Sequence, residues 1–330
     1  MSLLDVRDLR VSYRSSDGDV HAVDGVSLRI DAGEFVGLAG ESGCGKTTMA
    51  MAIPQLLPTN AHISSGSVTF DGVELSSLDE NEMRAYRWKD ISVVFQGALN
   101  ALNPVQTIGS QIAEPMRVHD ASVTAAEADD RMRELLEAVG IPSRRAHDYP
   151  HQFSGGMRQR VMIAMALACR PRLVIADEPI TALDVMTQAQ IIDLLQSLSD
   201  RYNLAMLLIS HDLSVLAQTC DRVAVMYAGK MAEMGPSNDV FGESDGVANA
   251  QHPYTQRLLR AYPNIHRERV FIDGIPGSPP DLSKPQVGCR FRPRCDVALD
   301  LCSVQEPTLV DLTESHVASC HRLVEGEVSA

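Results

Sequence analysis

The fold is decided by the stretch Gly40-Glu41-Ser42-Gly43-Cys44-Gly45-Lys46-Thr47, which fits the pattern G-x-x-x-x-G-K-[ST]. It follows an apolar segment, Phe35–Ala39, that is typical of a buried strand, and it precedes a predicted helix, Thr47–Leu57. A glycine-rich loop in this position cradles phosphate groups with its backbone N–H groups. We therefore predict an ATP or GTP site in which Lys46 neutralises the β- and γ-phosphates and the Thr47 hydroxyl binds magnesium.

Six further residues of this region complete the predicted nucleotide contacts: Gly40, Ser42, Gly43, Cys44, Gly45 and Thr48. Cys44 permits two interpretations. It is either a reactive thiol, because a helix N-terminus lowers the pKa of cysteine, or a small residue that fits the loop. We favour the second.

Composition indicates a folded protein that does not cross a membrane. Of the 330 residues, 45% are hydrophobic and 22% are charged, close to globular averages, and no apolar run approaches the roughly 20 residues of a membrane-spanning helix. The formal net charge of −14 argues against nucleic acid as a partner. The N-terminal stretch lacks the pattern of a secretory signal, so we expect a cytoplasmic protein.

Strands and helices alternate as in an α/β protein. The segments predicted to be strands are Val26–Ile30, Phe35–Ala39, Gly66–Val73, Ile91–Phe95, Leu173–Ala176, Ala205–Ile209 and Arg222–Met226. Helical periodicity covers Ala125–Val139, where Met132, Leu135, Leu136 and Val139 form an apolar face, and Thr187–Leu198. A helical subdomain therefore interrupts the sheet.

The predicted strand that begins at Leu173 ends in two adjacent carboxylates, Asp177 and Glu178. Alternation along a strand would direct them to different sides. Asp177 suits the magnesium shell, and Glu178 suits a general base that polarises the attacking water.

The segment Phe153-Ser154-Gly155-Gly156-Met157-Arg158-Gln159-Arg160 resembles the signature sequence of ABC ATPases. Four other motifs of that family are present, and all occur along the chain in the family's order. Tyr13 resembles the aromatic residue that stacks on adenine, Gln96 the Q-loop, Asp184 the D-loop and His211 the switch histidine. The chain is thus identified as a member of the ABC ATPases over about its first 235 residues.

This resemblance implies an ATPase whose catalytic residues are Glu178, His211, Gln96 and Lys46 and whose magnesium ligands are Thr47, Gln96 and Asp177. It implies a head-to-tail dimer in which Ser154, Gly155 and Gly156 contact nucleotide bound by the partner, which is an identical or a related subunit. The chain departs from the usual pattern with Phe153 for Leu, Met157 for Gln and Ile180 for Thr. None of these departures removes a catalytic group.

The stretch from Gln96 to Gly109, with Asn103-Pro104, resembles the ATPases of dipeptide and oligopeptide importers, although Gly97-Ala98 departs from their pattern. So do three segments near the end of the chain: His252–Thr255, Gly277–Leu282 and Gly288–Cys295. The implied fold is an α/β P-loop NTPase core with an antiparallel β subdomain and a helical signature subdomain, plus a small Cys-rich C-terminal extension. The expected domains are 1–235, with the helical subdomain at about 97–165, and 236–330.

The implied function is to energise import of di- or oligopeptides or related small solutes, from the cytoplasmic face of the cell membrane. The expected partners are two transmembrane permease subunits, a second ABC ATPase and an extracytoplasmic solute-binding protein. Nickel chelates or oligosaccharides are alternative substrates. A soluble ABC ATPase in DNA repair or translation is an alternative function, but the chain lacks a basic track for nucleic acid.

Four cysteines lie in the extension, at Cys289, Cys295, Cys302 and Cys320. Thiolate clusters bind soft metals, and these spacings are wider than those typical of structural zinc. The resemblance points to a [4Fe-4S] cluster held by the four thiolates. Zinc and no metal remain the alternatives.

Overall fold

The structure is a computed structural model that describes residues 2–16, 18–95, 101–244, 247–261 and 274–324. It consists of two compact units. Unit 1 comprises Met1–Leu3, Ile30–Phe35 and Phe70–Ile209, and unit 2 comprises Leu4–Arg29, Val36–Thr69 and Ser210–Ala330.

Unit 1 is built on three parallel strands. Its elements are β5 (Val73–Glu74), η1 (Leu75–Ser77), α2 (Glu80–Met83), β6 (Ile91–Val94), α4 (Ile108–His119), α5 (Ala125–Ala138), η2 (Ser143–His147), η3 (Pro150–Gln152), α6 (Gly155–Ala166), β7 (Leu173–Asp177), α7 (Val185–Tyr202) and β8 (Ala205–Ile209). Strand β7 pairs with β6 on one side and with β8 on the other. Every residue of β7 and β8 is buried, as expected for nearly continuous apolar runs in a parallel sheet.

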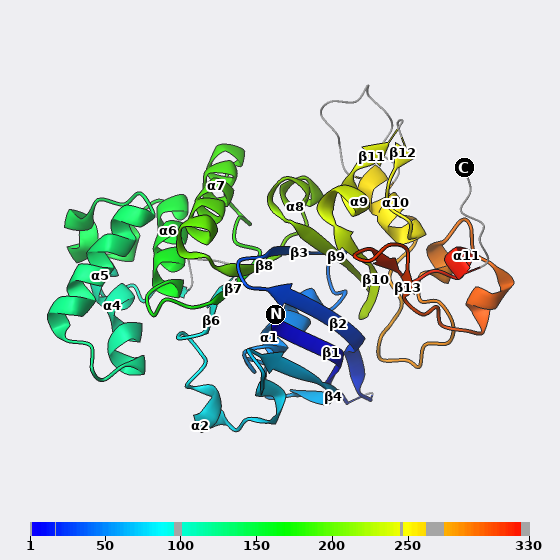
Figure 1. Cartoon of the computed structure of the whole chain (residues 1–330), viewed down its shortest axis with the longest axis horizontal. Coiled ribbons are helices and arrows are strands. Elements are labelled where there is room, and N and C mark those ends of the chain that lie inside the picture. The colour runs from blue at the N-terminus through cyan, green and yellow to red at the C-terminus, as the bar shows by residue number, and fades with distance from the viewer. Residues whose placement is uncertain (1, 17, 96–100, 245–246, 262–273, 325–330) are drawn as a thin grey trace. The chain divides into compact units, whose positions relative to one another are not determined.

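The helices α4, α5 and α6 of unit 1 pack against one another (Figure 1). Thr124 and Glu127 form a capping box at the start of α5. Met132, Leu135, Leu136 and Val139 are all buried, which confirms the predicted apolar face. The helix itself ends at Ala138, with Val139 as its C-cap.

Unit 2 contains most of the N-terminal strands and the C-terminal third of the chain. Its elements are β1 (Ser2–Tyr13), β2 (Val20–Asp31), β3 (Phe35–Ala39), α1 (Lys46–Ala52), β4 (Ala61–Phe70), α8 (Leu213–Thr219), β9 (Arg222–Tyr227), β10 (Lys230–Pro236), α9 (Ser237–Phe241), β11 (Glu243–Ser244), β12 (Val247–Ala248), α10 (Pro253–Arg260), η4 (Arg292–Arg294), η5 (Asp300–Ser303), β13 (Val310–Asp311), β14 (Val317–Ala318) and α11 (His321–Val324). One of its sheets has the order β2-β1-β4.

A second sheet of unit 2 connects the C-terminal segment to the strand before the glycine-rich loop. Its order is β13-β14-β10-β9-β3. Strands β3 and β9 are parallel, whereas β9 pairs with β10, and β10 with β14, in antiparallel fashion. The segment beyond residue 236 thus extends the sheet that supports the loop.

Two predicted elements end earlier than expected. The helix predicted to reach Leu57 ends at Ala52, because Pro54 has no N–H to continue the hydrogen-bond ladder and Gln55 has a left-handed φ of 52°. The strand predicted to reach Val73 ends at Phe70, before a turn at Asp71-Gly72 in which both residues have positive φ.

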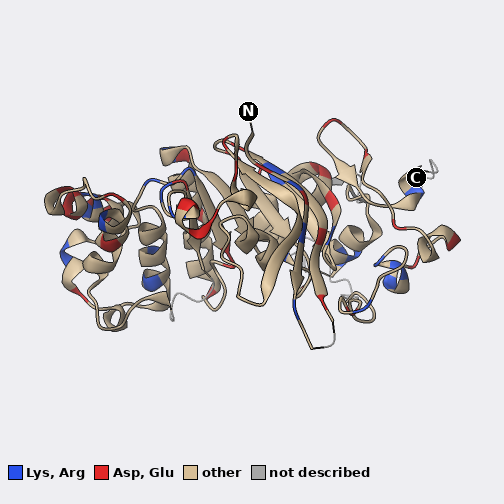
Figure 2. Cartoon of the chain, turned by 90° about the horizontal axis from the view of Figure 1, so that it is seen from below, with Lys and Arg blue, Asp and Glu red and all other residues tan. Residues whose placement is uncertain are grey.

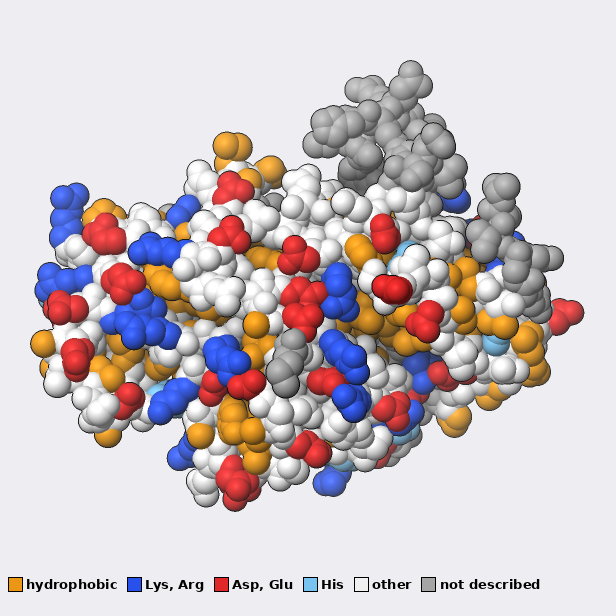
Figure 3. All heavy atoms as spheres, in the orientation of Figure 1, with side chains coloured by type: hydrophobic (Ala, Val, Ile, Leu, Met, Phe, Trp, Pro, Cys, Tyr) orange, Lys and Arg blue, Asp and Glu red, His pale blue; other side chains and the backbone are white. Residues whose placement is uncertain are grey.

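Basic and acidic residues are interspersed along the ribbon (Figure 2), and their side chains are interspersed on the face of the molecule seen in Figure 3. Among the described residues, no helix combines the length and apolarity needed to span a bilayer.

Candidate nucleotide-binding site

The glycine-rich loop of unit 2 is a close-packed turn that requires glycine at two positions. A Cβ atom on Gly40 would lie 2.2 Å from the carbonyl oxygen of Met226, and one on Gly45 would lie 2.2 Å from that of Ala22. Gly45 also has a φ of 102°, which side-chain-bearing residues rarely adopt. The loop is therefore held against the backbone of β2 and β9.

Lys46 opens helix α1, and its side chain folds back over the loop. Its ammonium donates to the carbonyl oxygens of Gly40, at 2.7 Å, and of Glu41, at 3.0 Å. The residue is only 7% exposed. A buried cation is thereby held at the centre of a loop of backbone groups, where a phosphate would meet it.

Tyr13 lies beside the same helix. Its hydroxyl is 3.0 Å from the hydroxyl oxygen of Thr48, so the end of β1 is joined to the first turn of α1. The structure thus brings together, within unit 2, the residue predicted to stack on adenine and the loop predicted to bind phosphate.

The environment of Cys44 favours a structural role. Its thiol is buried, and burial raises its pKa even though Lys46 acts in the opposite direction. Because the thiolate is the reactive form, a raised pKa leaves little reactive thiol near neutral pH. The small-residue interpretation is the one that this environment supports.

The two carboxylates of unit 1 occupy different environments, but not for the predicted reason. Asp177 ends β7 and is buried, whereas Glu178 lies beyond the strand with a left-handed φ of 50°. The turn after the strand, rather than alternation along it, therefore separates the two side chains. Glu178 accepts a hydrogen bond of 2.6 Å from the Thr181 hydroxyl, which holds its carboxylate in place.

The predicted signature residues begin helix α6 in unit 1. Ser154 is the N-cap, and its hydroxyl accepts from the N–H of Met157 at 3.3 Å. A Cβ atom on Gly156 would lie 2.5 Å from the Thr187 methyl carbon, so the starts of α6 and α7 approach too closely for a larger residue. Asp184 caps α7 by accepting from both the N–H and the hydroxyl of Thr187.

His211 belongs to unit 2 and is exposed, in the turn that leads into α8. Asp212 caps this helix by accepting from the N–H groups of Ser214 and Val215, and its own N–H donates to Ser210. Hydrogen bonds of Ser210 and Asp212 therefore fix the backbone on both sides of His211. Gln96 lies outside the described residues.

The predicted four-cysteine metal site is not supported. Cys289, Cys295, Cys302 and Cys320 are all described, yet none of the described His, Cys, Asp and Glu residues form a group of three or more that could hold a metal ion. All four are free cysteines, and burial raises the pKa of Cys289 to about 11.

Two residues that contact these motifs, Thr181 and Arg145, were not among the predicted site residues. Thr181 follows Glu178 by three residues, the spacing at which a hydroxyl can reach back across a turn, so a local signal existed. Arg145 contacts the signature from eight residues before it, and only the fold reveals this contact.

Comparisons with known proteins agree with this geometry. The family model described as "ABC transporter" matches residues 23–181, and that described as "Oligopeptide/dipeptide transporter, C-terminal region" matches residues 232–302. The oligopeptide transport ATP-binding protein OppD of Escherichia coli is 45% identical over 326 residues, which cover 98% of this chain and 94% of that protein. The dipeptide transport ATP-binding protein DppD of Bacillus subtilis is 43% identical over 321 residues, covering 96% and 94%.

Solved structures show the same fold. A dimeric ATP-binding cassette in a post-hydrolysis state with ADP and phosphate has a TM-score of 0.64 and 29% identity, covering 71% of this chain and 98% of that one. The protein cbiO1 of Clostridium perfringens, described as part of an ABC transporter complex, has a TM-score of 0.64 and 27% identity, covering 73% and 91%.

The predicted α/β ABC cassette fold is thereby confirmed, and with it the class of ATPase. The chain belongs to the family of ABC transporter ATP-binding proteins that carry the oligopeptide/dipeptide transporter C-terminal region.

Proposed function

We propose that this chain hydrolyses ATP to drive the import of di- or oligopeptides or of related small solutes. The observation that carries this proposal is the loop Gly40–Thr47, in which two glycines pack against carbonyl oxygens and Lys46 is enclosed by loop carbonyl groups. The match of residues 232–302 to the oligopeptide/dipeptide transporter region supports the class of substrate.

The proposed roles follow the chemistry of each group. Lys46 neutralises the terminal phosphates, and Tyr13 stacks on adenine. Glu178, oriented by Thr181, accepts a proton from the attacking water, and His211 stabilises the charge that develops on the phosphate.

The donor set Thr47, Asp177 and Gln96 offers only oxygen atoms from hydroxyl, carboxylate and amide groups, which suits Mg²⁺. The bound cation would neutralise charge on the β- and γ-phosphates.

The proposed assembly contains a second copy or a paralogue of this ATPase, because Ser154, Gly155 and Gly156 lie on an exposed or half-exposed helix start and would contact the partner's nucleotide. It also contains two transmembrane permease subunits and an extracytoplasmic solute-binding protein. The chain then lies at the cytoplasmic face of the membrane as a peripheral subunit. Within it, residues 1–235 are the nucleotide-binding domain, and residues 236–330 are the extension.

Mass spectrometry of the native complex tests this proposal. The tagged protein is extracted from its own membrane in mild detergent, and the bound proteins are identified. Two multi-span permeases with a solute-binding protein would support import, and the ligand of that binding protein would distinguish peptides from nickel chelates or oligosaccharides. Recovery of soluble partners or nucleic acid alone would leave an ABC ATPase but overturn the role in transport.

A further inference from the structure

The C-terminal extension contacts the glycine-rich loop directly, through Arg294. The side chain of Arg294 is 3% exposed and forms a paired contact with the Glu41 carboxylate, in which Nη1 donates to Oε2 at 2.6 Å and Nη2 donates to Oε1 at 2.9 Å. Glu41 is the second residue of the loop, and 253 positions separate the two residues. A parallel, two-bond contact between guanidinium and carboxylate is among the strongest charge-assisted hydrogen bonds.

Every N–H group of the Arg294 guanidinium donates a hydrogen bond. Besides Glu41, its Nη1 donates to the Tyr227 hydroxyl at 3.3 Å, its Nη2 to the carbonyl oxygen of Ile275 at 3.3 Å, and its Nε to that of Pro276 at 2.8 Å. Five N–H groups thus have five acceptors. Lysine could not reproduce this arrangement, because an ammonium carries three donors and lacks the planar fork.

The backbone of Glu41 is held as well as its side chain. Its N–H donates to the Tyr254 hydroxyl at 2.8 Å, while its carbonyl oxygen accepts from Lys46. Tyr254 is fully buried and packs with Tyr227 and Phe291, the ring centroids lying 4.6 to 5.4 Å apart. Tyr254 therefore belongs to an aromatic cluster of the extension and β9, and Arg294 contacts the same cluster through the Tyr227 hydroxyl.

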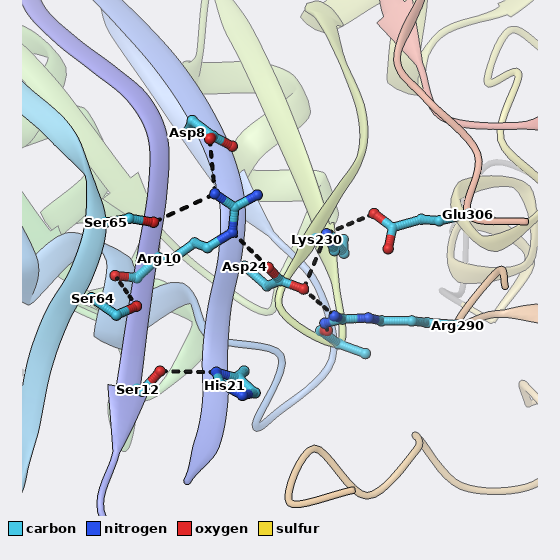
Figure 4. Close-up of polar contacts among 11 residues, drawn as sticks. Asp8, Arg10, Ser12, His21, Asp24, Ser64, Ser65, Lys230, Arg290 and Glu306 are labelled. Atoms are coloured by element: carbon cyan, nitrogen blue, oxygen red, sulfur yellow. Dashed lines mark hydrogen bonds and ion pairs between the residues drawn. The ribbon is translucent and has the colours of Figure 1, made fainter. Parts of the chain in front are cut away.

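A second cluster, of ion pairs, also anchors the extension (Figure 4). Asp24 of β2 accepts from Arg10 at 3.0 Å, from Lys230 at 3.1 Å and from Arg290 of the extension, and Lys230 also contacts Glu306 at 2.6 Å. This cluster attaches the extension to β2 and to Lys230 of β10. Arg294, by contrast, connects that anchored segment to the loop itself.

We propose that Arg294 is a positioning residue for nucleotide binding, which holds Glu41 and so keeps the glycine-rich loop in its binding conformation. The proposal rests on the proposed nucleotide site. The extension then contributes to ATP binding, and a structural change in the segment Cys289–Cys295 would alter the affinity for ATP through the side chain of Arg294.

The test measures the Kd of Mg-ATP for the purified full-length chain, with thermal unfolding of the nucleotide-free protein recorded alongside. Arg294→Gln and Glu41→Gln should each raise Kd about tenfold, and the double variant should be no weaker than the worse single one, because both remove the same interaction. Tyr254→Phe, which deletes one hydroxyl, should raise Kd about threefold.

Arg257→Gln is the matched control. Arg257 forms an ion pair of 2.9 Å with Asp296 in the same extension, and its loss should leave Kd within about twofold. If Arg294→Gln folds and binds Mg-ATP like the wild type, or if the effects of Arg294→Gln and Glu41→Gln simply add, the positioning role is wrong. If Arg294→Gln does not fold, Glu41→Gln decides because it removes the same ion pair, and an unchanged Kd in that variant rejects the proposal.

Lys46→Ala separates this proposal from the one on which it rests. A wild-type chain that binds Mg-ATP and loses binding in Lys46→Ala retains the nucleotide site whatever Arg294 does. Wild-type protein without affinity for Mg-ATP, or binding that does not depend on Lys46, would overturn both.

Discussion

Arg145 lies over the ring of Phe153, with its guanidinium carbon 4.1 Å from the ring centroid. The same side chain forms an ion pair with Asp148 and lies 3.5 Å from the sulfur of Met157. Phe153 and Met157 are the two positions at which the signature departs from the usual family residues. One arginine therefore contacts both departures, which indicates that they form a single packing arrangement at the start of α6.

Replacing Arg145 should destabilise this arrangement. Arg145→Ala removes a cation–π contact and a half-buried ion pair, so we expect the free energy of unfolding to fall by about 1–2 kcal/mol. Urea unfolding of the full-length chain measures the change. Arg133→Ala serves as the control, since its pair with Asp129 is exposed and should cost about 0.5 kcal/mol or less. An equal loss of unfolding free energy in both variants would contradict a stabilising contact between Arg145 and Phe153.

The glycines of the phosphate-binding loop should differ in their tolerance of alanine. Gly45→Ala combines a φ of 102° with a Cβ 2.2 Å from a carbonyl oxygen, so the free energy of unfolding should fall by at least about 3 kcal/mol. Gly43→Ala meets nothing within 4 Å, and its φ of 78° alone should cost about 1–2 kcal/mol. Chemical unfolding of the two variants without nucleotide would reveal the difference, and similar losses would mean that the backbone relaxes around the new methyl group.

Glu178→Gln should separate nucleotide binding from hydrolysis. The amide oxygen can still accept from the Thr181 hydroxyl, so the side chain keeps its orientation, but it cannot accept a proton from water. We expect bound ATP to persist while turnover falls at least about 100-fold. Single-turnover assays with radiolabelled ATP measure both quantities in one sample. Undiminished hydrolysis would remove Glu178 from its proposed role.

Local pattern predicted the buried strands well. The limits of β3 and β8 agree with the predicted Phe35–Ala39 and Ala205–Ile209, because a strand covered on both faces is a continuous apolar run that ends where polar residues begin. Helix α1 was predicted five residues too long because periodicity outweighed Pro54, whose effect on a helix can be read directly from the sequence.

Features that depend on tertiary contacts could not be predicted in the same way. The positive φ of Glu178 is set by a turn that hydrophobic patterning does not describe. The contact of Arg294 with Glu41 joins residues 253 positions apart, and no periodic pattern carries such information. The four cysteines and the family resemblance suggested a metal site, but neither determines whether the side chains are arranged to hold a metal ion.

His252 should make the stability of the protein sensitive to mild acid. Its ring is buried at the start of α10, where Nδ1 accepts from the N–H of Tyr254 at 3.0 Å as the helix cap. Burial lowers the pKa of His252 to about 4, although the nearby Glu233 carboxylate and a hydrogen bond with the backbone of Ser319 oppose the shift. A protonated ring could not accept from Tyr254, so the cap requires the neutral form.

The direction of the pH effect follows from this lowered pKa. Between about pH 6.5 and pH 4 the unfolded chain binds a proton at His252 while the folded chain does not, so stability falls as the pH falls through that range. His252→Asn keeps a side chain that caps helices well but does not titrate. Between pH 7.5 and pH 5.0, the wild type should therefore lose about 2 kcal/mol more than this variant, as measured by urea unfolding. The exposed His147→Asn is the control and should follow the wild type, whereas equal acid sensitivity of His252→Asn and the wild type would place the titrating group elsewhere.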